Sequence, residues 1–120
     1  MKVKWAERAR KQRDEVANYI RRLFGAKRKY LFKQEIRATT DLLKHSPYIG
    51  QIDPLFEDRA QTYRSVIVNG LNKMVYFIDE DIIHIVAFWD TRMEPEEQAR
   101  LTELFLHTHS EKKIAIKREP

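Results

Sequence analysis

Four polar residues near the ends of apolar segments could carry out chemistry in this sequence. Asp90 and Arg92 follow the apolar run Ile82–Trp89, which has the character of a buried strand, and Arg64 and Lys73 lie in two neighbouring β-rich segments. Cations grouped in this way could stabilise a phosphate, and a carboxylate could accept a proton. A carboxylate beside Arg92 is more naturally ionised and paired, which makes Asp90 a poor base. A plain cross-strand ion pair between Arg64 and Asp90 is the alternative.

Other familiar kinds of chemistry are excluded by composition and spacing. The absence of cysteine excludes a thiol nucleophile, thiolate metal ligands and disulfides. No glycine-rich phosphate loop is present, and His107 and His109 lie two residues apart, a spacing that puts them on different sides of a helix. The acidic run Asp79–Asp81 lies at an expected hairpin turn, where solvated charge is ordinary. We therefore expect no metal site and no cofactor.

The candidate residues must be positioned by a small mixed fold. Apolar residues recur every three or four positions in the first half, which predicts helices, whereas β-branched and aromatic residues dominate three runs in the second half. The expected elements are an edge strand in residues 1–5, helices over 6–24 and 27–44, strands over 63–68, 73–78 and 82–89, and a helix after Pro95 with Leu101, Leu104 and Phe105 on one face.

Short connections indicate how these elements pack. Only two or three residues around Gly25 separate the two helices, so they should form an antiparallel hairpin. Asn69-Gly70 and the acidic turn should join the three later strands into a meander. The predicted fold is α+β with two layers, in which the N-terminal strand and helix hairpin pack on a mainly antiparallel four-stranded sheet, in the order β-α-α-β-β-β-α. Residues 1–95 and an extension over residues 96–120 should form one domain.

The charge is distributed unevenly along the chain. Residues 1–46 hold fourteen Lys or Arg and five Asp or Glu, a net +9, whereas residues 47–120 hold nine and thirteen, a net −4. Such asymmetry is typical of a nucleic-acid face or of a surface for an acidic protein, although solvated helix faces are the plainer explanation. No signal-peptide core is present, and no apolar run approaches the ~18 residues that cross a bilayer. We expect a soluble, cytoplasmic protein with no membrane partner.

Four stretches resemble, in their order, the RelE/ParE superfamily of bacterial toxins from type II toxin-antitoxin pairs: VKWAERA, SPYIG, YRSVIV and KMVYFIDEDIIHIVAFWDTRMEP. In that family a first strand ends in an apolar or aromatic residue, a Pro-x-x-Gly turn follows a helix hairpin, and a meander ends in a polar group, often Arg-x-x-Pro. The corresponding residues here are Trp5, Pro47 with Gly50, and Arg92 with Pro95. Over residues 1–95 the resemblance implies a toxin that inhibits growth and takes part in plasmid stabilisation. It also implies that a cognate antitoxin neutralises this toxin in a hetero-oligomeric complex.

The resemblance leaves the target of the toxin open. ParE-like members poison DNA gyrase and have no established hydrolytic chemistry, whereas RelE-like members act on the ribosome and cut messenger RNA. In an RNA-cutting member, Arg64, Lys73 and Arg92 would bind phosphate and Asp90 would be the base. The strand end around Trp89 lacks the His or Tyr of many nucleases, and positive charge lies mainly on the helices.

Both points favour a ParE-like toxin that acts by binding gyrase and has no enzymatic activity. A ribosome-dependent messenger RNA endoribonuclease is the alternative. A third reading is a member that keeps the fold and the antitoxin docking but has lost toxicity.

The partner surface is expected on the sheet face that the helices leave uncovered. Strand alternation places Lys73, Val75 and Phe77 on one face of their strand. It likewise places His84, Val86 and Phe88 on one face of the last strand. Apolar residues on an uncovered face are typical of a docking site for an antitoxin helix or strand. Residues 96–120 should either pack over this face or extend the core. The expected partner-binding residues are Arg64, Lys73, Val75, Phe77, His84, Val86, Phe88 and Arg92.

Overall fold

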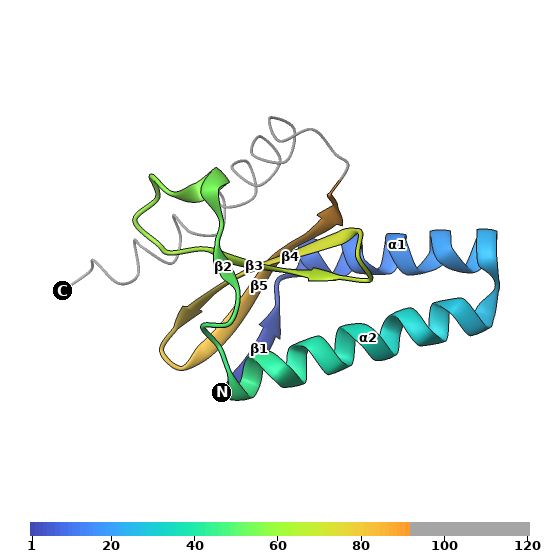
Figure 1. Ribbon diagram of the computed structural model, residues 1–120, viewed down its shortest axis with the longest axis horizontal. Coiled ribbons are helices and arrows are strands. Elements are labelled where there is room, and N and C mark those ends of the chain that lie inside the picture. Colours follow the sequence, from blue (N-terminus) through green and yellow to red (C-terminus); the bar gives the residue numbers. More distant parts are fainter. Residues whose placement is uncertain (92–120) are drawn as a thin grey trace.

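The structure is a computed structural model that describes residues 1–91 (Figure 1). The predictions for Arg92, for the C-terminal helix and for the tail lie outside the described residues. The elements are, in order, β1 (Lys2–Trp5), α1 (Glu7–Phe24), α2 (Ala26–His45), β2 (Gln51–Ile52), the 3₁₀ turn η1 (Pro54–Phe56), β3 (Arg64–Val68), β4 (Asn72–Asp79) and β5 (Ile82–Asp90).

The strands form one sheet in the order β1-β5-β4-β3-β2, with the helix hairpin packed on one of its faces (Figure 1). β1 runs parallel to β5 at one edge, and all other neighbours are antiparallel. The predicted α+β fold is confirmed, with five strands rather than four. The additional strand β2 has only two residues, which pair with Arg64 and Ser65, and so short a strand has no side-chain alternation that a sequence could reveal.

Gly25 joins the two helices into the predicted antiparallel hairpin. Its φ of 94° is a conformation that other residues rarely adopt, and its N–H donates to the carbonyl oxygen of Arg21 at 2.9 Å. On α1, Ala9 is buried and Val16 packs against the core, so these residues form an apolar stripe along the helix. Leu23 continues that stripe but is exposed, because the Gly25 end of the hairpin extends past the sheet (Figure 1).

Apolar side chains pack on both faces of the sheet. The core on the helix side includes Phe32, Ile36 and Leu43 of α2, together with Met74 and Tyr76 of β4. A second group lies on the opposite face, and we refer to it as the far-face cluster. Its buried members are Phe56, Tyr63, Val75, Phe77, Val86, Ala87 and Trp89.

A β-bulge interrupts the pairing of β4 with β5. Val75 pairs with Ala87, whereas the next residue, Tyr76, pairs with Ile85. Val86 is therefore one residue too many for the ladder, and two residues of β5 stand opposite one of β4. Such an insertion reverses the alternation of side chains beyond it, and this decides which residues of β5 reach each face.

Phe88 consequently turns toward the helices. Its ring centroid lies 6.2 Å from that of Trp5 and 6.0 Å from that of Phe32. The Phe88 N–H, next to the bulge, donates to Oε1 of Gln12 in α1 at 2.9 Å. The prediction that Phe88 shares the far face with His84 is wrong, because it assumed unbroken alternation along β5.

Candidate functional site

Arg64, the first residue of β3, supports the loop that follows α2. Its Nη1 donates to the carbonyl oxygens of Gly50 at 2.9 Å and of Tyr48 at 3.3 Å, and its guanidinium lies 5.3 Å from the centre of the Tyr48 ring. Arg64 stands opposite Tyr76 of β4, so it lies on the helix side of the sheet. A phosphate would have to compete with two carbonyl oxygens for this guanidinium.

Tyr76 holds the same loop from inside the fold. Its hydroxyl donates to the carbonyl oxygen of Pro47 at 2.7 Å and accepts from the N–H of Gly50 at 3.0 Å. Burial raises the pKa of Tyr76, and it outweighs the lowering effects of the Gly50 hydrogen bond and of the Arg64 charge. A Cβ at Gly50 would lie 2.6 Å from the Tyr76 hydroxyl, so this position requires glycine. The Pro-x-x-Gly turn seen in the sequence is thus anchored to the sheet.

Lys73 lies on the opposite face in a buried ion pair. Its Nζ is 3.0 Å from Oδ2 of Asp53, and the two side chains are 14% and 1% exposed. The other carboxylate oxygen of Asp53 accepts from the N–H of Leu55 at 3.0 Å and caps η1. The ammonium also lies 5.9 Å from the centre of the Trp89 ring. Sequence reasoning missed Asp53, because no local pattern links residues that are distant along the chain.

The predicted catalytic residues do not converge within the described part of the chain. Asp90 stands opposite Asn72 and lies on the helix side, whereas Lys73, the next residue of β4, lies on the far face. Arg64 stands opposite Tyr76. Tyr76 is four residues from Asn72 along β4, and this separation is about 13 Å at the usual rise of a strand. Arg64 and Asp90 are therefore not cross-strand neighbours, and the ion pair considered from the sequence is not formed.

The far face is packed at positions where the sequence predicts an open patch. Val75, Phe77 and Val86 are buried, with at most 8% of each exposed. The ring centroid of Tyr63 lies 5.5 Å from that of Phe77, and the His84 ring stacks on Phe77 at 4.7 Å. The expected bare apolar face is therefore not present at these residues, because the segment between β2 and β3 contributes aromatic side chains to it. A role of these residues in binding a partner stays a prediction.

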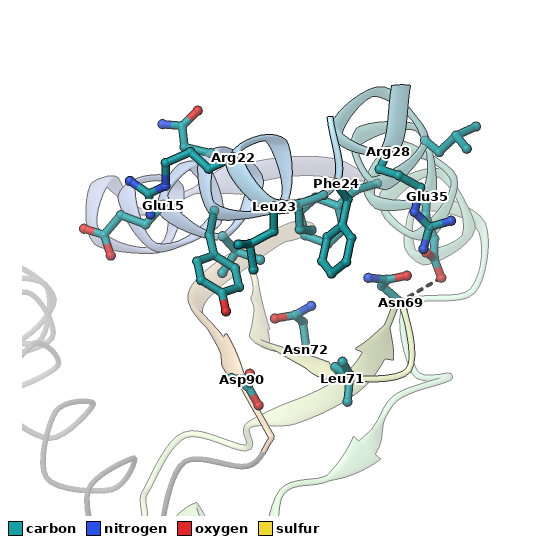
Figure 2. A pocket seen from close by; sticks show the side chains of 16 residues that line it. Glu15, Arg22, Leu23, Phe24, Arg28, Glu35, Asn69, Leu71, Asn72 and Asp90 are labelled. Carbon is teal, nitrogen blue, oxygen red and sulfur yellow. Dashed lines mark hydrogen bonds between the residues drawn. The ribbon is translucent and has the colours of Figure 1, made fainter. Parts of the chain in front are cut away.

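A groove of about 850 Å³ opens beneath the Gly25 end of the helix hairpin, above the turn between β3 and β4 (Figure 2). The N–H of Asn69 in this turn donates to Oε1 of Glu35 at 2.8 Å, which ties the turn to α2. Apolar surface gathered in a concave site is typical of a docking site. We refer to this site as the tip groove. Five large apolar residues that line it are 44% to 64% exposed: Tyr19, Leu23, Phe24, Leu31 and Leu71.

The hairpin end beside the tip groove is basic, whereas the groove itself is also lined by Glu15, Glu35 and Asp90. Residues 18–34 hold six Lys or Arg and no Asp or Glu, and Arg22 and Arg28 line the groove itself. Sequence reasoning recognised the basic first half but placed the apolar partner surface on the sheet. The signal that indicates the groove is the pair Tyr19 and Phe24, which flank the inner stripe near the end of a helix about 27 Å long.

Residues 1–91 combine a sheet covered on one face by two helices with a groove at the end of the helix hairpin. No group of three or more His, Asp or Glu side chains in this range is arranged to hold a metal ion. Within the same range, neither helix combines the length and the apolar composition needed to cross a membrane. The fold and the site define a small α+β protein with an apolar groove whose lining carries charges of both signs, and with dispersed polar side chains.

Comparisons with known proteins then identify the family. The chain matches the model of the ParE toxin of the type II toxin-antitoxin system, parDE, over residues 3–95. A solved structure, described as the chromosomal ParDE toxin-antitoxin system from P. aeruginosa, is similar with a TM-score of 0.61 and 16% sequence identity, over 75% of this chain and 95% of the matched chain. Among curated protein sequences no match was found. Because the family model covers most of the chain, the chain belongs to the ParE toxin family of type II toxin-antitoxin systems.

Proposed function

We propose that this chain is a bacterial toxin that binds and inhibits DNA gyrase, and that a cognate antitoxin holds it inactive in a hetero-oligomeric complex. Membership of the ParE toxin family supports the toxin class and the antitoxin partner. Action by binding is supported above all by one observation: Arg64 and Lys73 are engaged in structural contacts on opposite faces of the sheet.

Arg64, Lys73 and Asp90 are poorly arranged for the alternative activity, which is cleavage of messenger RNA on the ribosome. Cleavage requires a base, an acid and cations around a single phosphate, within hydrogen-bond distance of the reacting oxygens. The carboxylate of Asp53 neutralises Lys73 and would repel an approaching phosphate. Asp90 lies on the other side of the sheet from Lys73. The arrangement therefore favours a toxin that inhibits its target by binding it.

The proposal extends to the organisation and the location of the chain. Residues 1–95 form the toxin domain, and residues 96–120 are an extension of that same domain. The end of the family match at residue 95 supports this division. The toxin acts in the cytoplasm, where gyrase and DNA are found, and a chain without cysteine suits that reducing compartment.

A supercoiling assay tests the choice of target. Purified chain is added to purified gyrase, ATP and relaxed plasmid, and the expected result is loss of supercoiling that the antitoxin reverses. A parallel reaction contains translating ribosomes and a defined messenger RNA, which should stay intact. Cleaved messenger RNA with unimpaired supercoiling would establish the endoribonuclease instead. A chain that affects neither reaction, and whose expression leaves growth unhindered, would be a member that has lost toxicity.

A further inference from the structure

We propose that the seam between α1 and α2 binds the phosphate backbone of duplex DNA without reading its sequence. The two helices run side by side as an antiparallel hairpin (Figure 1). We refer to the surface as the basic seam, and the cations that define it are Arg10, Arg13 and Arg21 of α1 with Lys29, Lys33 and Arg37 of α2. The inference stands apart from the proposed function, which assigns no nucleic-acid contact to this chain.

Helical spacing places these cations in one row on each helix. Lys29, Lys33 and Arg37 follow one another at steps of four residues along α2, so they lie on one side of it. The row on α1 has spacings of three and eight residues, which also stay on one side of a helix. A cavity of about 260 Å³ joins the rows, because side chains of both helices line it: Trp5, Arg13, Lys33, Ile36, Arg37 and Thr40.

The charge in this cavity has one sign. Among the described residues that line it, Arg13, Lys33 and Arg37 are cations and none is Asp or Glu. Within residues 1–91 the side chains of Lys33 and Arg37 make no ion pair or hydrogen bond, whereas Arg13 pairs with the exposed Asp14 at 3.1 Å. Like charges that meet across a seam repel one another, and an anion placed between them removes that repulsion. The seam therefore selects an anionic ligand, in contrast to the tip groove, which carboxylates also line.

An acidic protein segment finds no apolar anchor in this cavity. Protein interfaces rely on apolar or aromatic side chains that become buried at their centre. The apolar lining here is already covered, since Ile36 is 6% exposed and the guanidinium of Arg13 lies 4.7 Å from the centre of the Trp5 ring. Exposed Leu23 and Leu31 line the tip groove instead. A phosphate backbone needs no such anchor, because cations alone supply its affinity.

Duplex DNA fits the seam better than RNA or a single strand does. Single strands are held by successive bases that stack on aromatic rings, but Arg13 already lies over the Trp5 ring. Exposed Tyr30 adds one ring beside the row on α2, and its hydroxyl can donate to a phosphate. Duplex RNA is recognised in part through its 2′-hydroxyls, whereas the Thr40 hydroxyl already donates to the carbonyl oxygen of Arg37 at 2.9 Å. Contact with phosphates alone is what duplex DNA requires.

The first test is the salt dependence of binding. The full chain is titrated into fluorescent DNA duplexes of about 20 base pairs and of unrelated sequences, and anisotropy is followed from about 50 to about 200 mM salt. The logarithm of the binding constant should fall linearly with the logarithm of the salt concentration, with a slope of about −4 to −5, as expected for about five phosphate contacts. The sequences should bind with equal affinity. Absence of binding at the lowest salt concentration, or a slope near zero, would overturn the proposal.

The second test locates the contact by comparing two double variants that lose the same charge. Lys33→Gln with Arg37→Gln alters the seam, whereas Arg22→Gln with Arg28→Gln alters the tip groove on the same hairpin, and all four side chains are exposed. The seam variant should bind DNA at least about tenfold more weakly, and its salt slope should be smaller by about 2. The control should keep the slope of the unaltered chain. Equal losses in both variants would mean that net charge alone binds DNA, which would overturn the site.

Two other outcomes would assign the seam to a different partner. Tighter binding of RNA of the same length, lost in the seam variant, would make RNA the ligand. A seam variant that keeps its affinity for DNA but loses affinity for the protein encoded by the adjacent reading frame would make the seam a protein interface. Thermal melting of each variant verifies that it is folded. None of these experiments contains gyrase, so a chain that binds DNA through the seam but leaves supercoiling unimpaired would support this inference and contradict the proposed target.

Discussion

Replacing Lys73 with methionine tests whether this cation supports the fold or serves a reaction. Methionine keeps the unbranched apolar stem but removes the ammonium, which lies 3.0 Å from Oδ2 of Asp53. Asp53 would then be a buried carboxylate without its cation, since its side chain is only 1% exposed. We expect Lys73→Met to be strongly destabilising even though it alters a residue that lies partly at the surface.

The magnitude follows from the geometry of the pair. Two unit charges 3.0 Å apart attract by about 5 kcal/mol at an effective dielectric constant of about 20. Removing one partner of a buried pair costs about 3–5 kcal/mol, because the remaining charge stays buried. The Lys73 side chain is 14% exposed, so water screens the site in part and the lower end of this range, about 3 kcal/mol, is expected.

Urea unfolding of four proteins measures this free energy. The single variants Lys73→Met and Asp53→Asn are compared with the unaltered chain and with the double variant. In the double variant an amide oxygen replaces the carboxylate oxygen that accepts from the N–H of Leu55. The unfolding free energy of the double variant should fall by only about 1 kcal/mol. Lys44→Met is an additional control, because Lys44 pairs with Asp41 at the surface, and it should change stability by less than about 0.5 kcal/mol. A loss below about 1 kcal/mol for Lys73→Met would refute the structural role and leave Lys73 available for chemistry.

Three further predictions concern other contacts. The pKa of Tyr76 is raised above its ordinary value of 10.0, so the contribution of its hydroxyl to folding stability is complete below about pH 10 and is lost as the pH rises through the folded pKa. Tyr76→Phe should therefore lose less unfolding free energy than the unaltered chain over that pH range. Gln12→Ala removes the acceptor of the Phe88 N–H at the bulge and should lower the unfolding free energy by about 1–2 kcal/mol, with faster hydrogen exchange at that amide, whereas Gln12→Glu keeps an acceptor. Arg92→Ala should relieve gyrase inhibition in the supercoiling assay, while Asp90→Asn, which matters chiefly for cleavage, should leave it intact.

Each of these predictions has an opposing result. Alkaline stability curves that coincide for the unaltered chain and Tyr76→Phe would mean that this hydroxyl does not titrate differently in the folded state. Unchanged exchange of the Phe88 amide in Gln12→Ala would show that the glutamine does not hold the bulge. Full inhibition by Arg92→Ala would place the toxic surface away from the strand exit.

Local patterns were sufficient for the helix hairpin and the meander. The spacings of seven and four residues from Ala9 through Val16 to Ile20 describe a helix face that packs on the sheet, and Asn69-Gly70 adopts the positive φ angles that a tight hairpin requires. These features depend on neighbours in the chain. β2 depends instead on the partner that β3 provides, and a two-residue strand has no period of its own.

The candidate site was harder to predict because its determinants are tertiary. A single extra residue, Val86, reverses the facing of Phe88, and nothing in an apolar run marks where a bulge falls. The ion pair of Lys73 with Asp53 joins segments twenty residues apart. The tip groove exists because the hairpin is longer than the sheet beneath it, so Leu23 has the spacing of a core residue but lies beyond the core.

The parallel pairing of β1 with β5 has a consequence for the newborn chain. Lys2 pairs with Ile82, so β1 cannot pair with β5 until the ribosome has added eighty further residues. At ~5–20 residues per second this delay lasts about 4–16 s, during which the hairpin can form but the sheet cannot close. Asn72 and Asp90, which complete the floor beneath the hairpin, are in place only after that closure. Before residue 90 is added, the nascent chain therefore has neither the closed sheet nor the complete floor of the tip groove.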